Sequence, residues 1–174
     1  MAVVPDSRAG FDEFVAARSS RLLRTAYLLT HDRGLAEDLL QTALSKAWFA
    51  WSRIDADPEP YVRRILVNTY ATWWRRKWNG EQPSDETHEA VEAGHDEAIA
   101  ARHDLWVAMA RLPRRQRAVI VLRYFEDLTE AQTAATLDCS IGTVKSQTAK
   151  ALAKLRVDPA LDTTTHPADE GRVR

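Results

Sequence analysis

The sequence predicts an all-α protein made of two small helical domains that are joined by a flexible acidic linker. Apolar residues recur at helical spacing over residues 11–78 and again over residues 97–157, and neither stretch shows the alternating pattern of a β-strand. Residues 79–96 are acidic and nearly free of large apolar side chains, so they cannot form a packed core. We therefore expect two separate helical cores.

Charge is divided along the chain into blocks of opposite sign. The 174 residues carry a formal net charge of −1 and a pI near 6.5, which is unusual for a protein that binds nucleic acid. The net charge is +3 over residues 1–78, −7 over 79–101, +5 over 102–157 and −2 over 158–174. Two basic blocks therefore flank an acidic one, and the neutral total conceals two candidate nucleic-acid surfaces. The last block is polar, contains two prolines and is predicted to be disordered.

Three helices are predicted in the N-terminal domain. The first covers about residues 11–29 and the second about 34–51, and Asp32 between them is placed to cap the second helix. The third covers residues 60–78, where Pro60 suits a first helical turn because that turn needs no backbone donor. The apolar positions of the first two helices predicted to face the core are Phe11, Phe14, Val15, Leu22, Ala26, Leu29, Leu35, Leu39, Leu40, Ala43, Ala47 and Trp51.

The C-terminal domain is predicted to contain two helices, at about residues 97–111 and 114–125, followed by a helix-turn-helix. Residues 129–156 show a helix, a break of four or five residues and a second helix that opens at Gly142 and Thr143. In a helix-turn-helix the second helix enters the major groove of DNA.

The second helix of this motif is basic on one side and apolar on the other. Its apolar stripe consists of Val144, Leu152 and Leu155, with Ala151 as a small filler. The opposite surface carries four cations, no acid and two further polar residues: Lys145, Lys150, Lys154, Arg156, Ser146 and Gln147. Such a helix can dock by its apolar side and offer donors to phosphates and base edges. A solvated basic helix in an ordinary bundle is the alternative interpretation.

The helix predicted over residues 60–78 combines aromatic side chains with cations. Flat rings stack on unpaired bases, at about 1–3 kcal/mol for each base, and cations hold the phosphate backbone. The residues concerned are Tyr61, Arg63, Arg64, Asn68, Tyr70, Trp73, Trp74, Arg75, Arg76, Lys77 and Trp78. Several of the aromatic residues are expected to be core, but the six consecutive residues 73–78 cannot all face inward. The pattern favours a surface for single-stranded nucleic acid.

The second predicted helix carries a polar face on an otherwise apolar segment. The face consists of Glu37, Asp38, Gln41, Thr42, Ser45 and Lys46. It is either ordinary solvated surface or a docking face for a helical partner, and the residues alone leave both interpretations open.

Three blocks of sequence, in this order, resemble extracytoplasmic-function sigma factors of bacterial RNA polymerase. They are Ala36–Trp48, Pro60–Trp78 and Leu112–Arg156, and the likeness is greatest to the actinobacterial sigma-E-type branch. The resemblance implies that residues 11–78 are sigma region 2 and that residues 97–157 are sigma region 4. It further implies a promoter-specificity subunit that has no catalysis, cofactor or metal of its own.

The resemblance also assigns residues to partners, which are the β and β′ subunits of core RNA polymerase, promoter DNA and, where one exists, an anti-sigma factor. The residues implied for core polymerase are Asp38 and Gln41, with Leu39 and Leu40 as packing support. Those implied for the −10 element, read as a melted single strand, are Arg64, Asn68, Trp73, Trp74, Arg75 and Arg76. Those implied for the −35 element are Thr143, Lys145, Ser146, Gln147 and Lys150.

Four residues depart from or qualify the family pattern in the helix-turn-helix. Thr133 stands where an aliphatic residue is usual and is expected to loosen the core slightly. Asp138 occupies a turn position where glycine is common, although Asp tolerates the left-handed region better than most residues. Ala149 is too small to support a base contact at its position. Cys139 is expected to be a small buried hydrophobe and not a redox sensor.

The alternative to a sigma factor is a stand-alone helix-turn-helix regulator, in which residues 11–78 sense a ligand or dimerise. Such a regulator should bind duplex DNA tightly without polymerase. An enzyme is disfavoured because the sequence has no glycine-rich phosphate loop, paired-Cys metal motif or nucleophile signature. The single Cys139 permits no internal disulfide, and no apolar stretch is long enough to span a membrane, so a cytoplasmic protein is expected.

Overall fold

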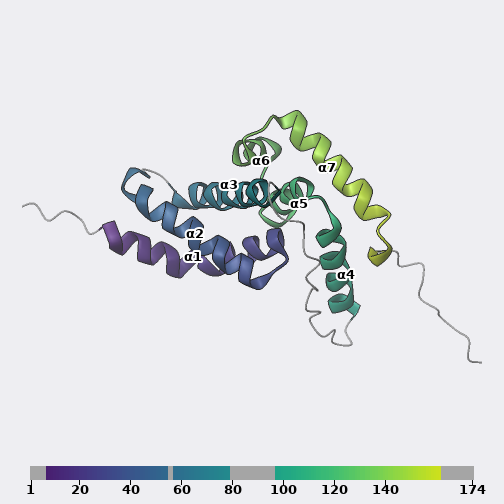
Figure 1. Cartoon of the computed structure of the whole chain (residues 1–174), viewed down its shortest axis with the longest axis horizontal. Coiled ribbons are helices and arrows are strands. Elements are labelled where there is room, and N and C mark those ends of the chain that lie inside the picture. The colour runs from purple at the N-terminus through teal and green to yellow at the C-terminus, as the bar shows by residue number, and fades with distance from the viewer. Residues whose placement is uncertain (1–6, 55–56, 79–96, 162–174) are drawn as a thin grey trace, which may run out of the picture.

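The structure of the chain, a computed structural model, is all-α as predicted (Figure 1). The backbone is described for residues 7–54, 57–78 and 97–161, and the side chains for the same ranges without residues 7–9, 74–78 and 97–100. Within these ranges seven α-helices form an N-terminal bundle, α1–α3, and a C-terminal bundle, α4–α7. Residues 79–96, the predicted linker, lie outside the described residues.

The N-terminal bundle consists of α1 (Ser7–Thr30), α2 (Arg33–Ala50) and α3 (Pro58–Trp78), with a short 3-10 turn at Trp51–Arg53. His31 has a left-handed backbone, with φ of 56°, and so ends α1 sharply. Asp32 then caps α2, as predicted, because its side chain accepts a hydrogen bond of 2.7 Å from the backbone N–H of Leu35.

Most of the positions predicted to face the core of this bundle are buried. The buried ones are Phe14, Leu22, Ala26, Leu29, Leu39, Leu40, Ala43 and Ala47, and the half-buried ones are Phe11, Val15, Leu35 and Trp51. Phe11 packs edge to face against Trp48 and Trp51, with ring centroids 5.1 and 5.0 Å apart. The helical period of the sequence therefore identified the buried faces of α1 and α2.

The C-terminal bundle consists of α4 (Glu97–Arg111), α5 (Arg114–Ile120), α6 (Glu130–Leu137) and α7 (Ile141–Arg156). The helix predicted over residues 114–125 is α-helical only as far as Ile120, and Val121–Phe125 form a π-helical turn. The backbone N–H of Glu126 closes this turn on the carbonyl oxygen of Val121 at 3.0 Å. Such turns are rare and occur often at functional sites.

The helix-turn-helix comprises α6 and α7, and its ends are capped by side chains. Thr129 and Gln132 form a reciprocal capping box at the start of α6, with hydrogen bonds of 3.1 and 2.8 Å. Asp138 ends α6 in the left-handed region, with φ of 51°. Ser140 caps α7 by accepting a hydrogen bond from the backbone N–H of Thr143. The break is three residues long, shorter than predicted.

The prediction of disorder from residue 158 onward is wrong for its first residues. Pro159–Leu161 form a 3-10 turn that packs against α4. Asp158 anchors this turn because its carboxylate lies 2.7 Å from the guanidinium of Arg111. Residues 162–174 lie outside the described residues.

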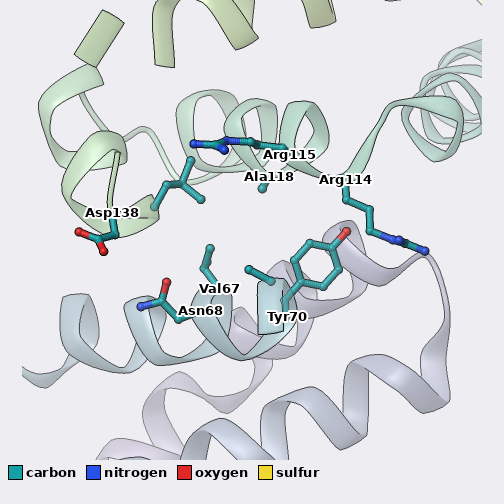
Figure 2. Close-up of a pocket in the computed structure, with 9 residues that line it drawn as sticks. Val67, Asn68, Tyr70, Arg114, Arg115, Ala118 and Asp138 are labelled. Carbon is teal, nitrogen blue, oxygen red and sulfur yellow. The ribbon is translucent and has the colours of Figure 1, made fainter. Parts of the chain in front are cut away.

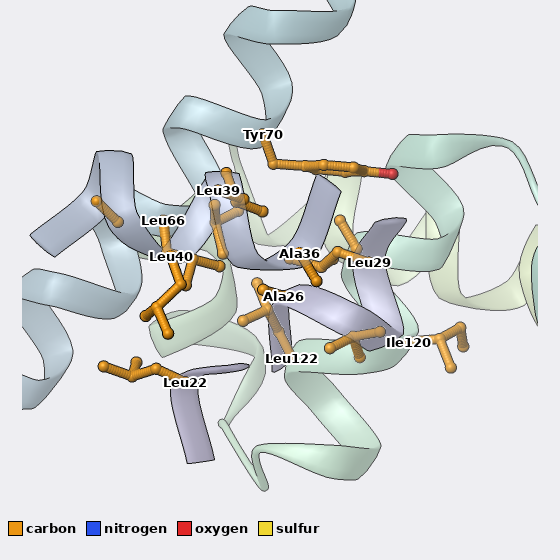
Figure 3. Packing of buried hydrophobic residues seen from close by; sticks show 14 of the residues in the cluster. Leu22, Ala26, Leu29, Ala36, Leu39, Leu40, Leu66, Tyr70, Ile120 and Leu122 are labelled. Atoms are coloured by element: carbon orange, nitrogen blue, oxygen red, sulfur yellow. The ribbon is translucent and has the colours of Figure 1, made fainter. Parts of the chain in front are cut away.

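The two bundles pack against one another. Helix α1 contacts α5 and the π-helical turn, and α3 contacts α6. One cluster of buried apolar residues runs through both bundles, so that Leu29 and Ala36 lie close to Ile120 and Leu122 (Figure 3). The sequence predicted two domains but not this contact between them, since helical periodicity carries no information about which surfaces of two domains meet.

Candidate nucleic-acid and polymerase interfaces

The side of α7 that faces away from the core is basic. Lys145, Ser146 and Lys150, three of the five residues implied for the −35 element, are exposed, and Thr143 and Gln147 are half-buried. The opposite side is held in the core by Val144, Ala151 and Leu155. Figure 1 shows α7 at the outer edge of the molecule, away from α1 and α2. One helix thus combines a buried anchor with an accessible cationic face.

Polar contacts fix the start of this face. The hydroxyl groups of Thr143 and Ser140 lie 2.9 Å apart, and the hydroxyl of Ser146 donates to the backbone carbonyl of Thr143 at 3.1 Å. The ammonium group of Lys145 lies 3.8 Å from the carboxylate of Glu130 on α6. This exposed pair restrains Lys145 only weakly, so its ammonium group remains available to a phosphate or a base edge.

Four residues of α3 form an exposed stripe, which we call the α3 stripe: Tyr61, Arg64, Asn68 and Ala71. Their spacing of three, four and three residues places them on one side of the helix. Arg64 and Asn68, both implied for the −10 element, therefore lie on one accessible face. The structure brings these two together but does not add Trp73, the one tryptophan of this set whose side chain is described.

The remaining residues implied for the −10 element divide into two groups. Trp73 is half-buried and packs against the apolar core, so it supports the fold of α3 and is not a free stacking platform. Trp74, Arg75 and Arg76 continue α3, but their side chains lie outside the described residues. Arg63, which the sequence grouped with the nucleic-acid cations, is buried and paired with carboxylates.

Only some of the residues implied for core polymerase lie on the exposed face of α2. Asp38 and Gln41 are exposed, whereas Leu39 and Leu40 are buried and can act only as packing support. Sequence reasoning missed Phe49, whose side chain is 78% exposed. It lies two turns after Gln41 on the same side of the helix. An exposed phenylalanine beside a polar face was detectable from the spacing, but the sequence analysis assigned it neither to the core nor to the polar face.

A pocket of about 610 Å³ lies between α3 and the C-terminal bundle. Asn68 and Tyr70 lie on its α3 side, and Arg114, Arg115 and Asp138 lie on the other (Figure 2). Burial raises the pKa of the Tyr70 phenol, and the positive charges of Arg117 and Arg114 only partly offset that effect. Burial likewise lowers the pKa of Arg114. The α3 stripe thus borders a groove whose far wall belongs to the other bundle.

Buried charges at the contact between the bundles are the other feature that the sequence did not reveal. Glu59, Arg63, Arg117 and Glu126 are all buried. Charged residues are rarely buried unless they are paired, and sequence patterns assign them to the surface by default. Their partners lie up to 105 positions apart in the chain, so no local pattern could have found them.

Comparison with known families identifies the family of the chain. Residues 14–80 match the model of sigma-70 region 2, and residues 102–155 match that of sigma-70 region 4. The chain therefore belongs to the sigma-70 family of RNA polymerase sigma factors. A sigma factor binds core RNA polymerase and directs it to promoters, and it is not an enzyme. The presence of both regions favours this function over a stand-alone regulator.

Individual relatives show which sigma-70 factors the chain resembles. The RNA polymerase sigma-E factors of Streptomyces coelicolor and Streptomyces antibioticus are 39% and 42% identical to the chain, over 84% of it and 84% and 82% of their own lengths. The ECF RNA polymerase sigma factor SigM of Mycobacterium tuberculosis is 32% identical, over 87% of this chain and 78% of its own. The resemblance to extracytoplasmic-function sigma factors is thereby confirmed.

Two solved structures share the fold. The sigma factor RpoE from Bartonella quintana, crystallised with the anti-sigma factor NepR, aligns with a TM-score of 0.68 and 23% identity, over 84% of this chain and 94% of that one. CnrH in complex with the cytosolic domain of CnrY aligns with a TM-score of 0.59 and 21% identity, over 86% of each chain. In the part of this chain that the structure describes, no helix is long and apolar enough to cross a membrane.

Proposed function

We propose that this sigma factor divides its function among three exposed surfaces. The polar face of α2, with Asp38, Gln41 and Phe49, binds core polymerase. The α3 stripe, with Arg64 and Asn68, binds the −10 element once it is melted. The basic face of α7 binds the −35 element as duplex. On this basis residues 11–78 act as region 2 and residues 97–157 as region 4.

The architecture of α7 is the observation that carries the proposal for the −35 element. Its cations are exposed on one side while Val144 and Leu155 are buried on the other, which is how a recognition helix is held in the major groove. Lys145 and Ser146 lie in the N-terminal half of the helix, the half that approaches base edges. Lys150 lies further along, where phosphates are within reach.

Transcription from a library of −35 variants tests this assignment. If Lys145 reads a base edge, Lys145→Ala should weaken binding to the −35 element by about 1–3 kcal/mol and so lower transcription. It should also relax the base preference at one position of that element. If Lys145 contacts a phosphate, all sequences should weaken alike and the dependence on salt should become shallower. Arg102→Ala, which removes an exposed cation from α4, outside the proposed contacts, is the matched control. Unchanged activity and preference in Lys145→Ala would show that the recognition surface lies elsewhere.

Two further proposals follow from the family. Because sigma factors act with polymerase, we place this chain in the cytoplasm. The structural neighbours were solved with anti-sigma factors, NepR and the cytosolic domain of CnrY, and we extend such a partner to this chain. Purification of the tagged protein from its native cell should retain both core polymerase and the inhibitor. Recovery of polymerase alone would speak against an anti-sigma factor.

A further inference from the structure

Helix α7 begins with a large apolar side chain that is exposed. Ile141 is the first residue of the helix, directly after the Ser140 cap, and it is 44% exposed. The other large apolar residues of α7 are buried or half-buried, and they are Val144, Leu152 and Leu155. The core of the C-terminal bundle therefore accounts for those three side chains but leaves much of Ile141 in water.

The start of α7 does not depend on an apolar residue at position 141. Polar groups fix it, since Ser140 Oγ accepts a hydrogen bond of 3.1 Å from the backbone N–H of Thr143. Isoleucine is also a weaker helix former than alanine, because its branched side chain has little freedom at χ1 in a helix. Single exposed apolar residues are common on protein surfaces, so exposure alone assigns no role. What distinguishes Ile141 is its position relative to the basic face of α7.

Ile141 lies one helical turn before Lys145, on the same side of α7. Residues four positions apart are neighbours on a helix surface, and helical side chains lean toward the N-terminus of the helix. In a helix-turn-helix, the N-terminal residues of the second helix contact base edges in the major groove. The surface proposed for the −35 element therefore continues from Lys145 to Ile141, which is the residue of α7 nearest the end that enters the groove.

Gly142 leaves space for DNA next to Ile141. Its backbone is not in the left-handed region, and a Cβ atom at this position would meet only Ser140 Oγ among the described residues, at an ordinary contact distance of 3.8 Å. Neither backbone conformation nor packing therefore requires a glycine here, although glycine weakens a helix relative to alanine. The missing side chain lets the first turn of α7 approach a base pair closely.

The major groove offers an aliphatic side chain one apolar partner, the C5-methyl group of thymine. The other base edges present hydrogen-bond donors and acceptors, which lose water and gain no hydrogen bond when an isoleucine covers them. Contact with the methyl group of thymine instead removes two apolar groups from water. An isoleucine at the start of a recognition helix therefore favours thymine over the other three bases.

We propose that Ile141 is a specificity-determining residue that packs against the methyl group of one thymine in the −35 element. This role rests on the assignment of α7 to that element and adds a base identity to it. Lys145 and Ser146 supply polar contacts, whereas Ile141 supplies an apolar one. The apolar surface of Ile141 that water covers in the free protein becomes buried when the −35 element binds.

Replacement of thymine by deoxyuridine tests this contact, since it removes only the methyl group. Holoenzyme formed from the full-length chain and core polymerase is titrated with promoter duplexes that carry the −35 sequence preferred by the parent. Each duplex has one thymine of this element replaced, on either strand. One replacement should weaken binding by the parent about fourfold, as expected for the loss of one buried methyl group. In Ile141→Ala the same replacement should have little effect, because the apolar partner is gone.

Two further variants are compared with Ile141→Ala. Ile141→Val keeps the branched shape and should retain part of the sensitivity to deoxyuridine. Val157→Ala shortens another exposed aliphatic residue, directly after α7 and outside the proposed contacts, and should respond to deoxyuridine as the parent does. The difference between the parent and Ile141→Ala at one thymine measures their coupling, in which effects of deoxyuridine on the DNA itself cancel. If Ile141→Ala loses its helices by circular dichroism, Ile141→Val decides alone.

A preferred −35 sequence with no thymine on either strand would overturn this role of Ile141. So would a parent that binds every deoxyuridine duplex as well as the unmodified one, or equal losses in the parent and Ile141→Ala. Failure of the −35 assignment itself is distinguishable, because Lys145→Ala would then also have no effect. If Lys145→Ala weakens binding while no thymine is coupled to Ile141, the recognition surface stands and the role of Ile141 falls.

Discussion

At the scale of single residues, the buried hydroxyl of Thr133 is the clearest imperfection of the helix-turn-helix. The residue is 0% exposed, and no residue in the described part of the chain forms a hydrogen bond with its Oγ1. Thr136, one turn later, is also buried, but its hydroxyl donates to the carbonyl of Gln132 at 2.8 Å. The two threonines of α6 therefore differ in whether their hydroxyl groups are satisfied.

Thr133→Val should stabilise the protein, because it replaces an unsatisfied polar atom by a methyl group of similar size. We expect a gain of about 1 kcal/mol and a rise of about 2–4 °C in Tm. Thr136→Val is the matched control and should be neutral or destabilising, since it removes a hydrogen bond. Calorimetry of both variants checks this. A lower Tm for Thr133→Val than for the parent would indicate that its hydroxyl has a partner.

Tyr70 gives a prediction for alkaline pH. Burial raises the pKa of its phenol above the ordinary value of 10.0, so the folded protein holds this proton more tightly than the unfolded chain does. The stability that depends on the neutral phenol is complete below about pH 10 and is lost as pH rises through the folded pKa.

The free energy of unfolding of the parent should therefore fall between about pH 10 and 11 more steeply than that of Tyr70→Phe, which has no phenol at this position. Tyr124→Phe, a change at an exposed tyrosine, is the control. Urea denaturation at pH 9, 10 and 11 gives the three slopes. Equal slopes for the parent and Tyr70→Phe would mean that burial of this phenol does not affect the stability.

At the scale of the helices, a structural feature could be predicted from the sequence only where residues close together in the chain cause it. The helices, the Asp32 cap and the basic face of α7 follow from the side chains of neighbouring residues, and all were predicted. Arg63 and Arg64 show the limit of prediction from neighbouring residues. They are adjacent in the sequence, yet Arg63 is buried against Glu59 and Glu126 while Arg64 is exposed. The side chains packed around α3, from its own bundle and from the other, distinguish them.

The residues of the candidate surfaces likewise divide into those that could be located from the sequence and those that were missed. The resemblance located Asp38, Gln41, Arg64 and Asn68, and the structure places all four on exposed helix faces. The exposure of Phe49 was missed although its spacing from Gln41 continues the polar face of α2, and an aromatic residue at helical spacing is more often part of a core. The π-helical turn was also missed, since helical periodicity does not distinguish a π-turn from a continuing α-helix.

The face of α2 leads to a prediction about polymerase binding. Asp38→Ala with Gln41→Ala should weaken binding of core polymerase without loss of helix, because both side chains are exposed. Phe49→Ala should weaken it by about 1–2 kcal/mol, as expected when an aromatic anchor is removed from an interface. Asp12→Ala, an exposed carboxylate on α1, is the control. Titration with labelled core polymerase measures all of these, and unaltered affinity in both α2 variants would contradict the assignment.

At the scale of the whole molecule, the order of events on a promoter follows from the state of the DNA that each proposed surface binds. The α2 face, the basic face of α7 and the α3 stripe are all exposed, and the α3 stripe also borders the groove between the bundles. The surfaces proposed for core polymerase and for the duplex −35 element can therefore bind before the −10 element melts. Contacts to bases become available only after those bases leave the duplex, so they stabilise the open complex selectively.

Asn68→Ala should consequently leave core binding intact and lower the fraction of open complexes. Permanganate footprinting on a fully paired template and on one with a mismatched −10 region separates two causes. A defect in melting should be partly rescued by the mismatch, whereas a loss of contacts to unpaired bases should persist on both templates. We expect the second result, because the amide of Asn68 is exposed beside Arg64 and can bind a base edge directly. Normal melting of the paired template by Asn68→Ala would remove this residue from the site.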